Sequence, residues 1–329
     1  MNKRVIGIMM ISTKNANYNA GLDGSPRKIM DNFVVSPFAG KYSIRKYWKD
    51  KNLDVFTTKT LKEISSKNDG KDVRQGAKTL DEKLANSIEK YNLDKTNVLA
   101  IQNGLFKHYV DISCFGGIFT VKADKEICKV DFNEHYTGAI QFGYGVNCYD
   151  NTNVIYDIIS SPFVNSNKSE NEKTTLGNRE LLDEAHFAYK FTVNPNNYSI
   201  YKELDENFVG LTDEAYNQFK IAAINAVTYG DSVAKIGAEN EMTMFIELKE
   251  GSMLSLPSLE DKIVFHKKEN NNGKDVIDLT QIQKLLKKVD ADIEKIEIYH
   301  YEDLTDIIFE KSDKVIIKDI LTSYNEGMR

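Results

Sequence analysis

Residue types that commonly carry catalysis occur in this chain without the spacing that catalysis requires. The five histidines never lie four residues apart, and neither the HExxH zinc motif nor the GxSxG nucleophile motif is present. Gly40-Lys41 is similar to the end of a phosphate-binding loop, but Val35 stands where its first glycine belongs and Tyr42 where serine or threonine belongs. The sequence therefore predicts no enzyme, no metal site and no cofactor.

Positive charge is concentrated in one part of an otherwise acidic chain. The formal net charge is −6, whereas nucleic-acid-binding proteins usually carry a basic excess because they neutralise phosphates. Between residues 27 and 51, however, seven basic residues stand against only two acidic ones. If the protein binds RNA, its positive charge must be gathered on one face. The candidate phosphate contacts in this segment are Arg27, Lys28, Lys41, Arg45, Lys46 and Lys49.

The cysteines and the hydropathy pattern indicate the compartment. Cys114, Cys128 and Cys148 are widely spaced and form no CxxC pair, so they indicate neither a disulfide framework nor a zinc site. No apolar run approaches the roughly 18–20 residues needed to span a bilayer. The apolar stretch Val5–Ile11 lacks a following small-residue cleavage site and favours a strand over a signal peptide. We therefore expect a cytoplasmic protein with no membrane partner.

The elements that must position these residues alternate between strands and helices. The aliphatic run Arg4–Ser12 predicts a buried strand, and a long polar loop follows from Thr13 to about Phe38. Lys41–Lys51 has helical character. Two glycine-containing segments, Tyr109–Val121 and Gly138–Cys148, predict further strands.

A second helix and a fourth strand complete the pattern. Thr212 is placed to cap a helix whose apolar positions Ala215, Phe219 and Ala222 share one face, and Met242–Leu248 predicts a strand. This order is the βαββαβ order of the ferredoxin-like, RRM-type fold, so the predicted fold class is α+β with insertions. Other predicted elements are a helix over Thr79–Tyr91, a strand over Phe187–Val193, strand-like Lys262–His266 and Ile296–Tyr299, and a helix near Gln281–Val289.

Several segments carry motifs of one protein family. The first strand runs into an asparagine-rich loop, Asn15–Asn19, and the basic helix follows. Asp111–Gly116 is similar to a D-x-R-x-F-G strand, with Ser113 in place of the arginine. Thr174–Arg179 resembles a T-M-G-R segment, with leucine for methionine and asparagine for arginine. Two more segments, Thr137–Phe142 and Ser232–Gly237, are similar to "tGpvQf" and "SRSKIG".

In this order, over roughly residues 4–265, the segments resemble the backbone subunit of type I CRISPR Cascade complexes, the Cas-seven family in its Csh/Csd branch. The resemblance implies a right-hand shape with an RRM-like palm, a large finger insertion and a thumb hairpin. It implies a single palm domain over 1–329, with a loop, basic helix and finger-like insertion over 13–108. It also implies a thumb-like hairpin over 155–200 and a C-terminal extension of the palm over 262–329.

The same resemblance implies a structural role in antiviral defence. Members polymerise along a CRISPR RNA (crRNA) guide, whose base pairing reads the target DNA. The implied partners are therefore crRNA, target DNA through the guide, copies of the same chain and other Cascade subunits. Leu176 is placed as an apolar wedge between bases, flanked by Lys173 and Arg179. The remaining implied RNA contacts are Asn17, Ser232 and Lys235.

Two other functions stay open at this point. Related backbone subunits of type III complexes cleave RNA with a metal and an aspartate in the loop after the first strand, where this chain has Asp23 and Asp31. An RRM-like fold also serves as a scaffold without nucleic acid, because fold does not determine function.

Overall fold

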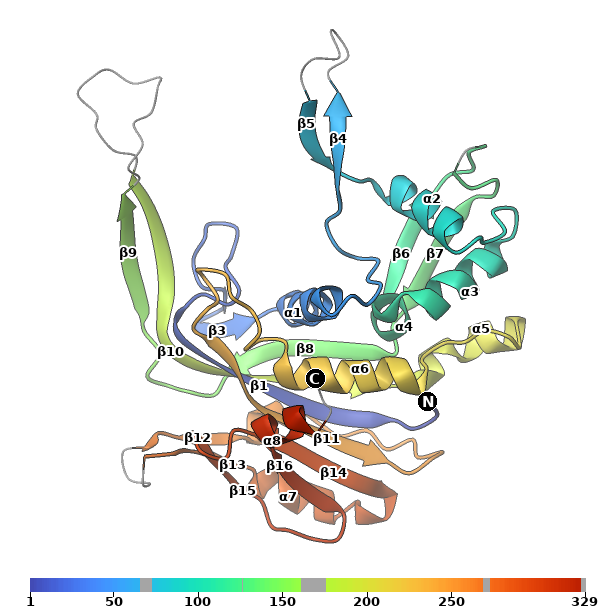
Figure 1. Ribbon diagram of the computed structural model, residues 1–329. Helices are drawn as coiled ribbons and strands as arrows, with labels where there is room; N and C mark the ends of the chain where they lie inside the picture. The colour runs from blue at the N-terminus through green and yellow to red at the C-terminus, as the bar shows by residue number, and fades with distance from the viewer. Residues whose placement is uncertain (66–72, 126, 161–175, 269–272, 327–329) are drawn as a thin grey trace, which may run out of the picture. The chain divides into compact units, whose positions relative to one another are not determined.

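A computed structural model of the protein describes residues 1–65, 73–125, 127–160, 176–268 and 273–326 (Figure 1). The chain divides into two compact units, which we call the helical unit and the sheet unit. The helical unit comprises Met1–Arg4, Arg45–Gln141 and Thr192–Ala222, and the sheet unit comprises Val5–Ile44, Phe142–Phe191 and Ala223–Arg329.

A mostly antiparallel main sheet organises the sheet unit, and the fold is a mixed α+β one (Figure 1). Antiparallel pairing joins β1 to β11, β11 to β14 and β9 to β10, whereas β14 and β16 run parallel. The strand order is β16 (Val315–Asp319), β14 (Ile293–His300), β11 (Ala238–Leu248), β1 (Val5–Ala16), β10 (Leu176–Val193), β8 (Ile140–Asn147), β3 (Asn32–Val35) and β2 (Lys28–Ile29), with β9 (Val154–Ser160) paired to β10.

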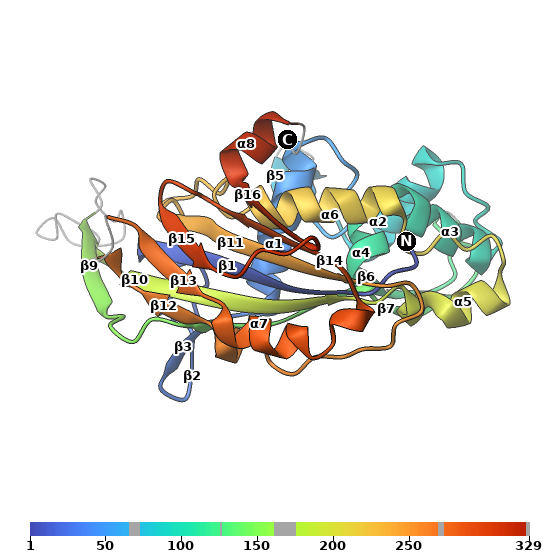
Figure 2. The same ribbon diagram turned by 90° about the horizontal axis from the view of Figure 1, so that it is seen from below.

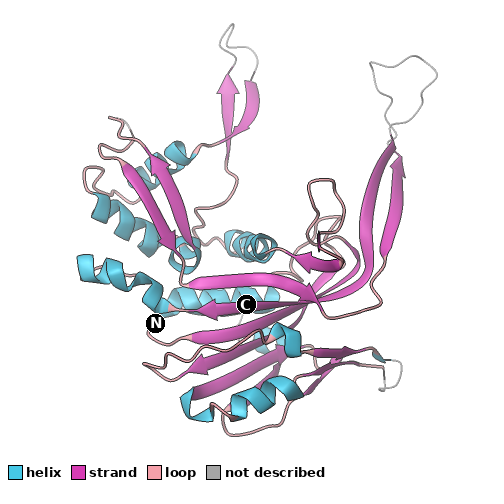
Figure 3. Ribbon diagram, turned by 180° about the vertical axis from the view of Figure 1, so that it is seen from behind, coloured by secondary structure: helices cyan, strands magenta, loops and turns pink. Residues whose placement is uncertain are grey.

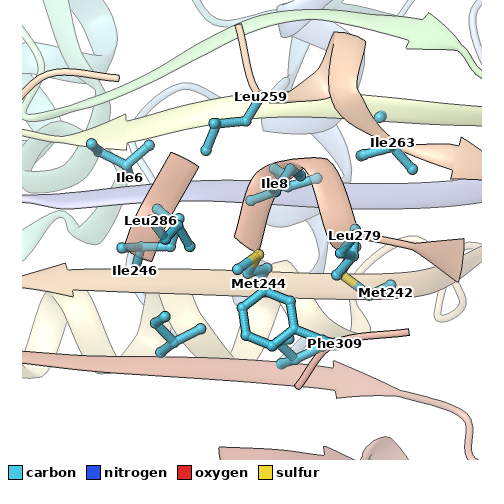
Figure 4. Packing of buried hydrophobic residues seen from close by; sticks show 14 of the residues in the cluster. Ile6, Ile8, Met242, Met244, Ile246, Leu259, Ile263, Leu279, Leu286 and Phe309 are labelled. Carbon is cyan, nitrogen blue, oxygen red and sulfur yellow. The ribbon is translucent and has the colours of Figure 1, made fainter. Parts of the chain in front are cut away.

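Strand β1 is buried on both faces, which explains its unbroken aliphatic sequence. On one face Ile6 and Ile8 pack with Met244 of β11 and Leu286 in a shared hydrophobic cluster (Figure 4). Leu286 belongs to helix α7 (Thr280–Lys287), which is labelled in the view from below (Figure 2). On the other face Gly7 leaves room for the ring of Phe191, since a Cβ there would lie 2.0 Å from it. The predicted first strand is therefore confirmed and extends to Ala16.

Helices α1 (Pro37–Asp50) and α6 (Asp213–Asn225) confirm two sequence predictions. Helix α1 begins where the Oγ of Ser36 accepts a hydrogen bond from the Ala39 N–H, with Pro37 in its first turn. The Oγ1 of Thr212 accepts from the Ala215 N–H at 3.0 Å and caps α6 as expected. At the other end of α6, the Ala223 carbonyl accepts from the Asn240 side chain of β11.

The C-terminal part of the sheet unit is richer in strands than predicted. The expected strands near 262–266 and 296–299 and the expected helix near 281–289 are confirmed as β12, β14 and α7. Three strands and a helix were not predicted from the sequence. The unpredicted elements are β13 (Asp275–Asp278), β15 (Thr305–Ile308), β16 and α8 (Ile320–Asn325). Strands β13 and β15 lie with β12 (Val264–His266) in a separate three-stranded sheet.

The helical unit contains two hairpins and several short helices (Figure 3). Thr79 and Glu82 form a capping box at the start of α2, which confirms the helix expected there. The elements are β4 (Leu61–Ser65) paired with β5 (Val73–Ala77), α2 (Leu80–Lys90), α3 (Val98–His108), α4 (Val110–Phe115), β6 (Gly116–Val121) paired with β7 (Phe132–Thr137), and α5 (Ser199–Leu204).

Two sequence predictions are wrong in part. The first half of the strand expected over Tyr109–Val121 is helix α4, because buried Asp111 accepts hydrogen bonds from the Phe56 and Thr57 N–H groups and such tertiary contacts override a weak β-propensity. The loop expected from Thr13 to Phe38 contains the end of β1 together with β2 and β3, since β3 pairs with β8.

A buried ionic cluster lies beside the core of the sheet unit. The Nδ1 of His186 lies 2.9 Å from both carboxylate oxygens of Glu241, and its Nε2 lies 3.4 Å from Glu184. Lys267 in turn pairs with Glu184 and with Asp275. Burial lowers the pKa of His186, but the two glutamates outweigh burial and raise this pKa to about 9.

This cluster predicts a loss of stability in alkali. The pKa of His186 is higher in the folded chain than its ordinary value of 6.5, so its contribution is complete below that value and lost as the pH rises through about 9. We expect His186→Gln to lower the melting temperature at pH 6.5 and to lower it much less at pH 10. The control is the exposed histidine variant His135→Gln. An equal effect of His186→Gln at both pH values would contradict a charged histidine.

Candidate functional site

Three segments of the sheet unit meet around the carboxyl end of β1. The Lys14 N–H donates to the Gly237 carbonyl at 2.7 Å, and the Asn17 N–H donates to the Ala234 carbonyl at 2.9 Å. Tyr18 is buried, and its hydroxyl lies 2.8 Å from the Ser43 Oγ of α1. These bonds hold the turn 231–237 and the start of α1 on the same strand end. We call the surface formed by Arg27, Lys28, Phe38, Lys41, Tyr42 and residues 232–237 the β1-end surface.

The turn approaches β1 too closely to accept a side chain at its last position. A Cβ added to Gly237 would lie 1.9 Å from the Lys14 carbonyl oxygen, a backbone atom that cannot move aside without shifting the strand. Ser232 is exposed, and its carbonyl accepts hydrogen bonds from the Lys235 and Ile236 N–H groups at 2.8 Å each. The turn is therefore rigidly placed, and it holds Lys235 in a defined position.

Lys235 lies between two tyrosine rings. Its Nζ is 4.6 Å from the ring centroid of Tyr42 and 5.2 Å from that of Tyr18, which is cation–π geometry. Burial lowers the pKa of Lys235. Within the part of the chain that the structure describes, no carboxylate pairs with this ammonium group, so its charge is available to an anionic ligand.

The loop after β1 supplies two more cations. The Arg27 N–H donates to the Asn19 carbonyl, and the Arg27 carbonyl accepts from the Val34 N–H, so the loop folds back on β3. The Nε of Arg27 is buried and has no hydrogen-bond partner among the described residues. Lys28 is exposed, and its Nζ lies 4.2 Å from the ring of Phe33.

Asn17 is placed differently from its neighbours. Its side-chain amide donates to the carbonyls of Gly24 and Glu180 at 3.0 and 3.1 Å, and only 8% of the residue is exposed. Both amide hydrogens are thus occupied by backbone. Asn17 therefore connects the loop to β10 and has a structural function. The sequence pattern alone did not distinguish this function from RNA binding.

The basic residues in the second half of α1 belong to the helical unit. The Nε of Arg45 lies 3.2 Å from the carboxylate of Asp111, which is fully buried. Lys46 pairs with Asp50 one turn later, at 2.5 Å. Lys49 is exposed. Arg45 and Lys46 therefore carry charges that a carboxylate of the same unit partly neutralises.

The hairpin of β9 and β10 carries the other predicted contacts. Arg179 lies opposite Asp157 in the register, and its Nε is 2.8 Å from that carboxylate. Leu176 is the first residue of β10 and pairs with Ser160. Lys173 lies outside the described residues. Three apolar side chains of β9 are exposed: Tyr156, Ile158 and Ile159.

Exposed apolar side chains on the β1-end surface were not predicted from the sequence. Phe38 and Tyr42 of α1 are 78% and 56% exposed, and Val233 and Ile236 of the turn are 77% and 70% exposed. Phe38 and Tyr42 are four residues apart in a basic helix, and this spacing in the sequence could have predicted that both rings lie on one helical face. The surface combines cations with exposed rings, which suits a strand that carries both phosphates and aromatic bases.

The metal-dependent nuclease considered above would need acidic side chains grouped around a metal ion, and the described ranges can be compared with this requirement. There, no three His, Cys, Asp or Glu side chains are grouped in a way that holds a metal ion. Asp23, in the loop after β1, accepts a hydrogen bond from the Ser25 N–H. Among the helices that are described, none is long and apolar enough to cross a membrane.

Comparisons with known proteins agree with one another. A protein-family model described as "CRISPR-associated protein Cas7" matches residues 3–285. No curated protein matches the sequence. A solved chain from a "CRISPR RNA-guided surveillance complex, pre-nicking" has a TM-score of 0.50 at 13% identity and covers 98% of this chain and 100% of its own. A chain from a "CRISPR RNA-guided surveillance complex" has a TM-score of 0.50 at 12% identity, over 98% and 99% of the two chains. At these identities the structural similarity concerns the fold alone.

Proposed function

The chain belongs to the CRISPR-associated protein Cas7 family, and on this premise we propose that it is a structural, RNA-binding backbone subunit of a type I CRISPR surveillance complex. In this role it binds the crRNA guide, and the guide pairs with the target DNA. Its other partners are further copies of itself and other Cascade subunits, in the cytoplasm. We assign it to the Csh/Csd branch on the sequence motifs.

The strand order supports an RRM-like palm. The four strands β11, β1, β10 and β8 are neighbours in that order, which is the arrangement of a ferredoxin-like βαββαβ sheet when α1 follows β1 and α6 follows β10. We propose that residues 13–108 include the finger-like insertion, that 155–200 form the thumb-like hairpin and that 262–329 are a C-terminal extension of this palm. Strands β14 and β16 extend the sheet beyond β11.

The observation that carries the RNA-binding proposal is Lys235 on the β1-end surface. Its ammonium group contacts the rings of Tyr18 and Tyr42 and has no carboxylate partner among the described residues, and its backbone belongs to the turn that β1 holds in place. Phosphate contacts of this kind supply affinity without reading sequence. We propose Arg27, Lys28, Lys41, Ser232 and Lys235 as RNA contacts on this surface.

The remaining predicted RNA contacts divide into candidate phosphate contacts, a candidate wedge between bases and residues with a structural function. Lys46, Lys49, Lys173 and Arg179 are candidate phosphate contacts, and Leu176 is the candidate wedge at the start of β10. For Asn17 and Arg45 we propose structural functions, because their donors bind groups of the chain itself.

Self-association is supported by β9. Among the described strands, β9 pairs with β10 alone, and it exposes Tyr156 by 76% and Ile158 by 70%. An exposed apolar edge strand is a site at which another chain docks. We propose that a second copy covers it when the subunits line up on the guide.

The proposal is tested on protein purified from cells that express crRNA. We expect an absorbance ratio at 260 and 280 nm that indicates bound nucleic acid, and extracted RNA that contains the guide. Complementary RNA added with Mg²⁺ should stay intact, because the proposed role is structural. Protein that is free of RNA, and that binds none when crRNA is added, would contradict RNA binding. Periodic cuts in the added RNA would instead establish the metal-dependent nuclease.

A further inference from the structure

Two aromatic side chains on α1 are left open to solvent in the described structure. Phe38 is 78% exposed and Tyr42 is 56% exposed. They lie four residues apart in a continuous helix, so both project from the same helical face. Buried aromatic side chains contribute strongly to stability, yet these two rings contribute little to the core of the sheet unit. A ligand that covers them would bury this exposed apolar area.

The charges around the rings decide what kind of ligand fits. The Nζ of Lys235 lies over the Tyr42 ring, 4.6 Å from its centroid. An apolar peptide would gain nothing from this cation and would have to desolvate it. A strand of nucleic acid matches both features, because its phosphates are anionic and its bases present flat aromatic faces.

We propose that Phe38 and Tyr42 form a stacking platform for unpaired bases of the guide. This inference rests on the proposed function and adds to it that the surface holds RNA by base faces as well as by phosphates. Stacking tolerates any base, so the platform is compatible with a subunit that binds guides of different sequence.

The test compares two single-stranded RNAs of equal length and charge, one with normal bases and one with abasic sites. We expect the wild-type protein to bind the normal RNA about 10-fold more tightly, which is within the range measured for base–aromatic stacking. In the double variant Phe38→Leu/Tyr42→Leu this difference should vanish, while binding of the abasic RNA stays unchanged. Tyr42→Phe keeps the ring and should behave as the wild type.

A fluorescent base and a matched variant make the test specific. The emission of 2-aminopurine in the RNA should be changed by the wild-type protein and not by the double variant. Tyr324→Leu, which removes an exposed ring from α8, is the control and should leave both readings unchanged. Equal binding of normal and abasic RNA by the wild type would overturn stacking while RNA binding stands. Binding of neither RNA would overturn the proposed function together with the platform.

Discussion

Reversing the charges of Lys41 and Lys235 together should reduce guide RNA binding by at least about 100-fold at physiological salt. The two lysines lie on the β1-end surface, and each reversed charge replaces attraction to phosphate by repulsion. The logarithm of the affinity falls with the logarithm of salt concentration, with a slope of about 0.7 for each phosphate contact on a single strand. The variant Lys41→Glu/Lys235→Glu should therefore show a slope that is smaller by about 1.4.

A matched variant separates this effect from overall charge. Lys284 and Lys288 are exposed at helix α7, which packs on the opposite face of the main sheet from α1. Lys284→Glu/Lys288→Glu changes the net charge by the same amount and should bind RNA nearly as well as the wild type. Anisotropy titrations of labelled RNA at several salt concentrations measure both quantities. If the two double variants bind equally, the β1-end surface is not the RNA site.

Removing the carboxylate of Asp111 should destabilise the helical unit by about 3–5 kcal/mol, the cost of breaking a buried ion pair from one side. Asp111 is fully buried, and it accepts hydrogen bonds from the Phe56 and Thr57 N–H groups as well as from Arg45. In Asp111→Ala all three donors lose their acceptor. The measurement is the free energy of unfolding in urea.

The exposed pair in the same helix provides the comparison. Lys46 and Asp50 are an i, i+4 pair that is partly exposed, and such pairs contribute about 0.3–0.5 kcal/mol. Asp50→Ala should therefore change stability little. If Asp111→Ala is also nearly neutral, Arg45 is not held by that carboxylate. Its inclusion among the RNA contacts would then regain support.

Arg45 and Lys41 of the basic helix differ in what a loss of RNA binding in their variants would mean. Charge reversal at Arg45 would place two carboxylates together in a buried site, so a loss of RNA binding would report unfolding. Lys41 is the better probe, because it belongs to the sheet unit and lies one turn from the start of α1. The basic composition of residues 27–51 did not distinguish these two positions.

Local patterns predicted fewer than half of the helices and strands that the structure describes. The aliphatic run of β1, the capping box at Thr79 and the cap at Thr212 act within a few residues, so the sequence determines them directly. The family motifs are equally local, which is why the collinear resemblance agrees with the family match. Helix α4 was missed because its formation depends on Asp111 bonding to residues more than fifty positions earlier in the chain.

Only the tertiary structure decided which cations are available to a ligand. By itself the sequence determined that positive charge is concentrated in residues 27–51 of an acidic chain and that the chain belongs to the Cas7 family. Whether a given lysine or arginine is neutralised depends on carboxylates and rings from distant segments, as Arg45 with Asp111 and Lys235 with Tyr18 and Tyr42 demonstrate. Packing brings those groups together, and no pattern of neighbouring residues encodes their contact.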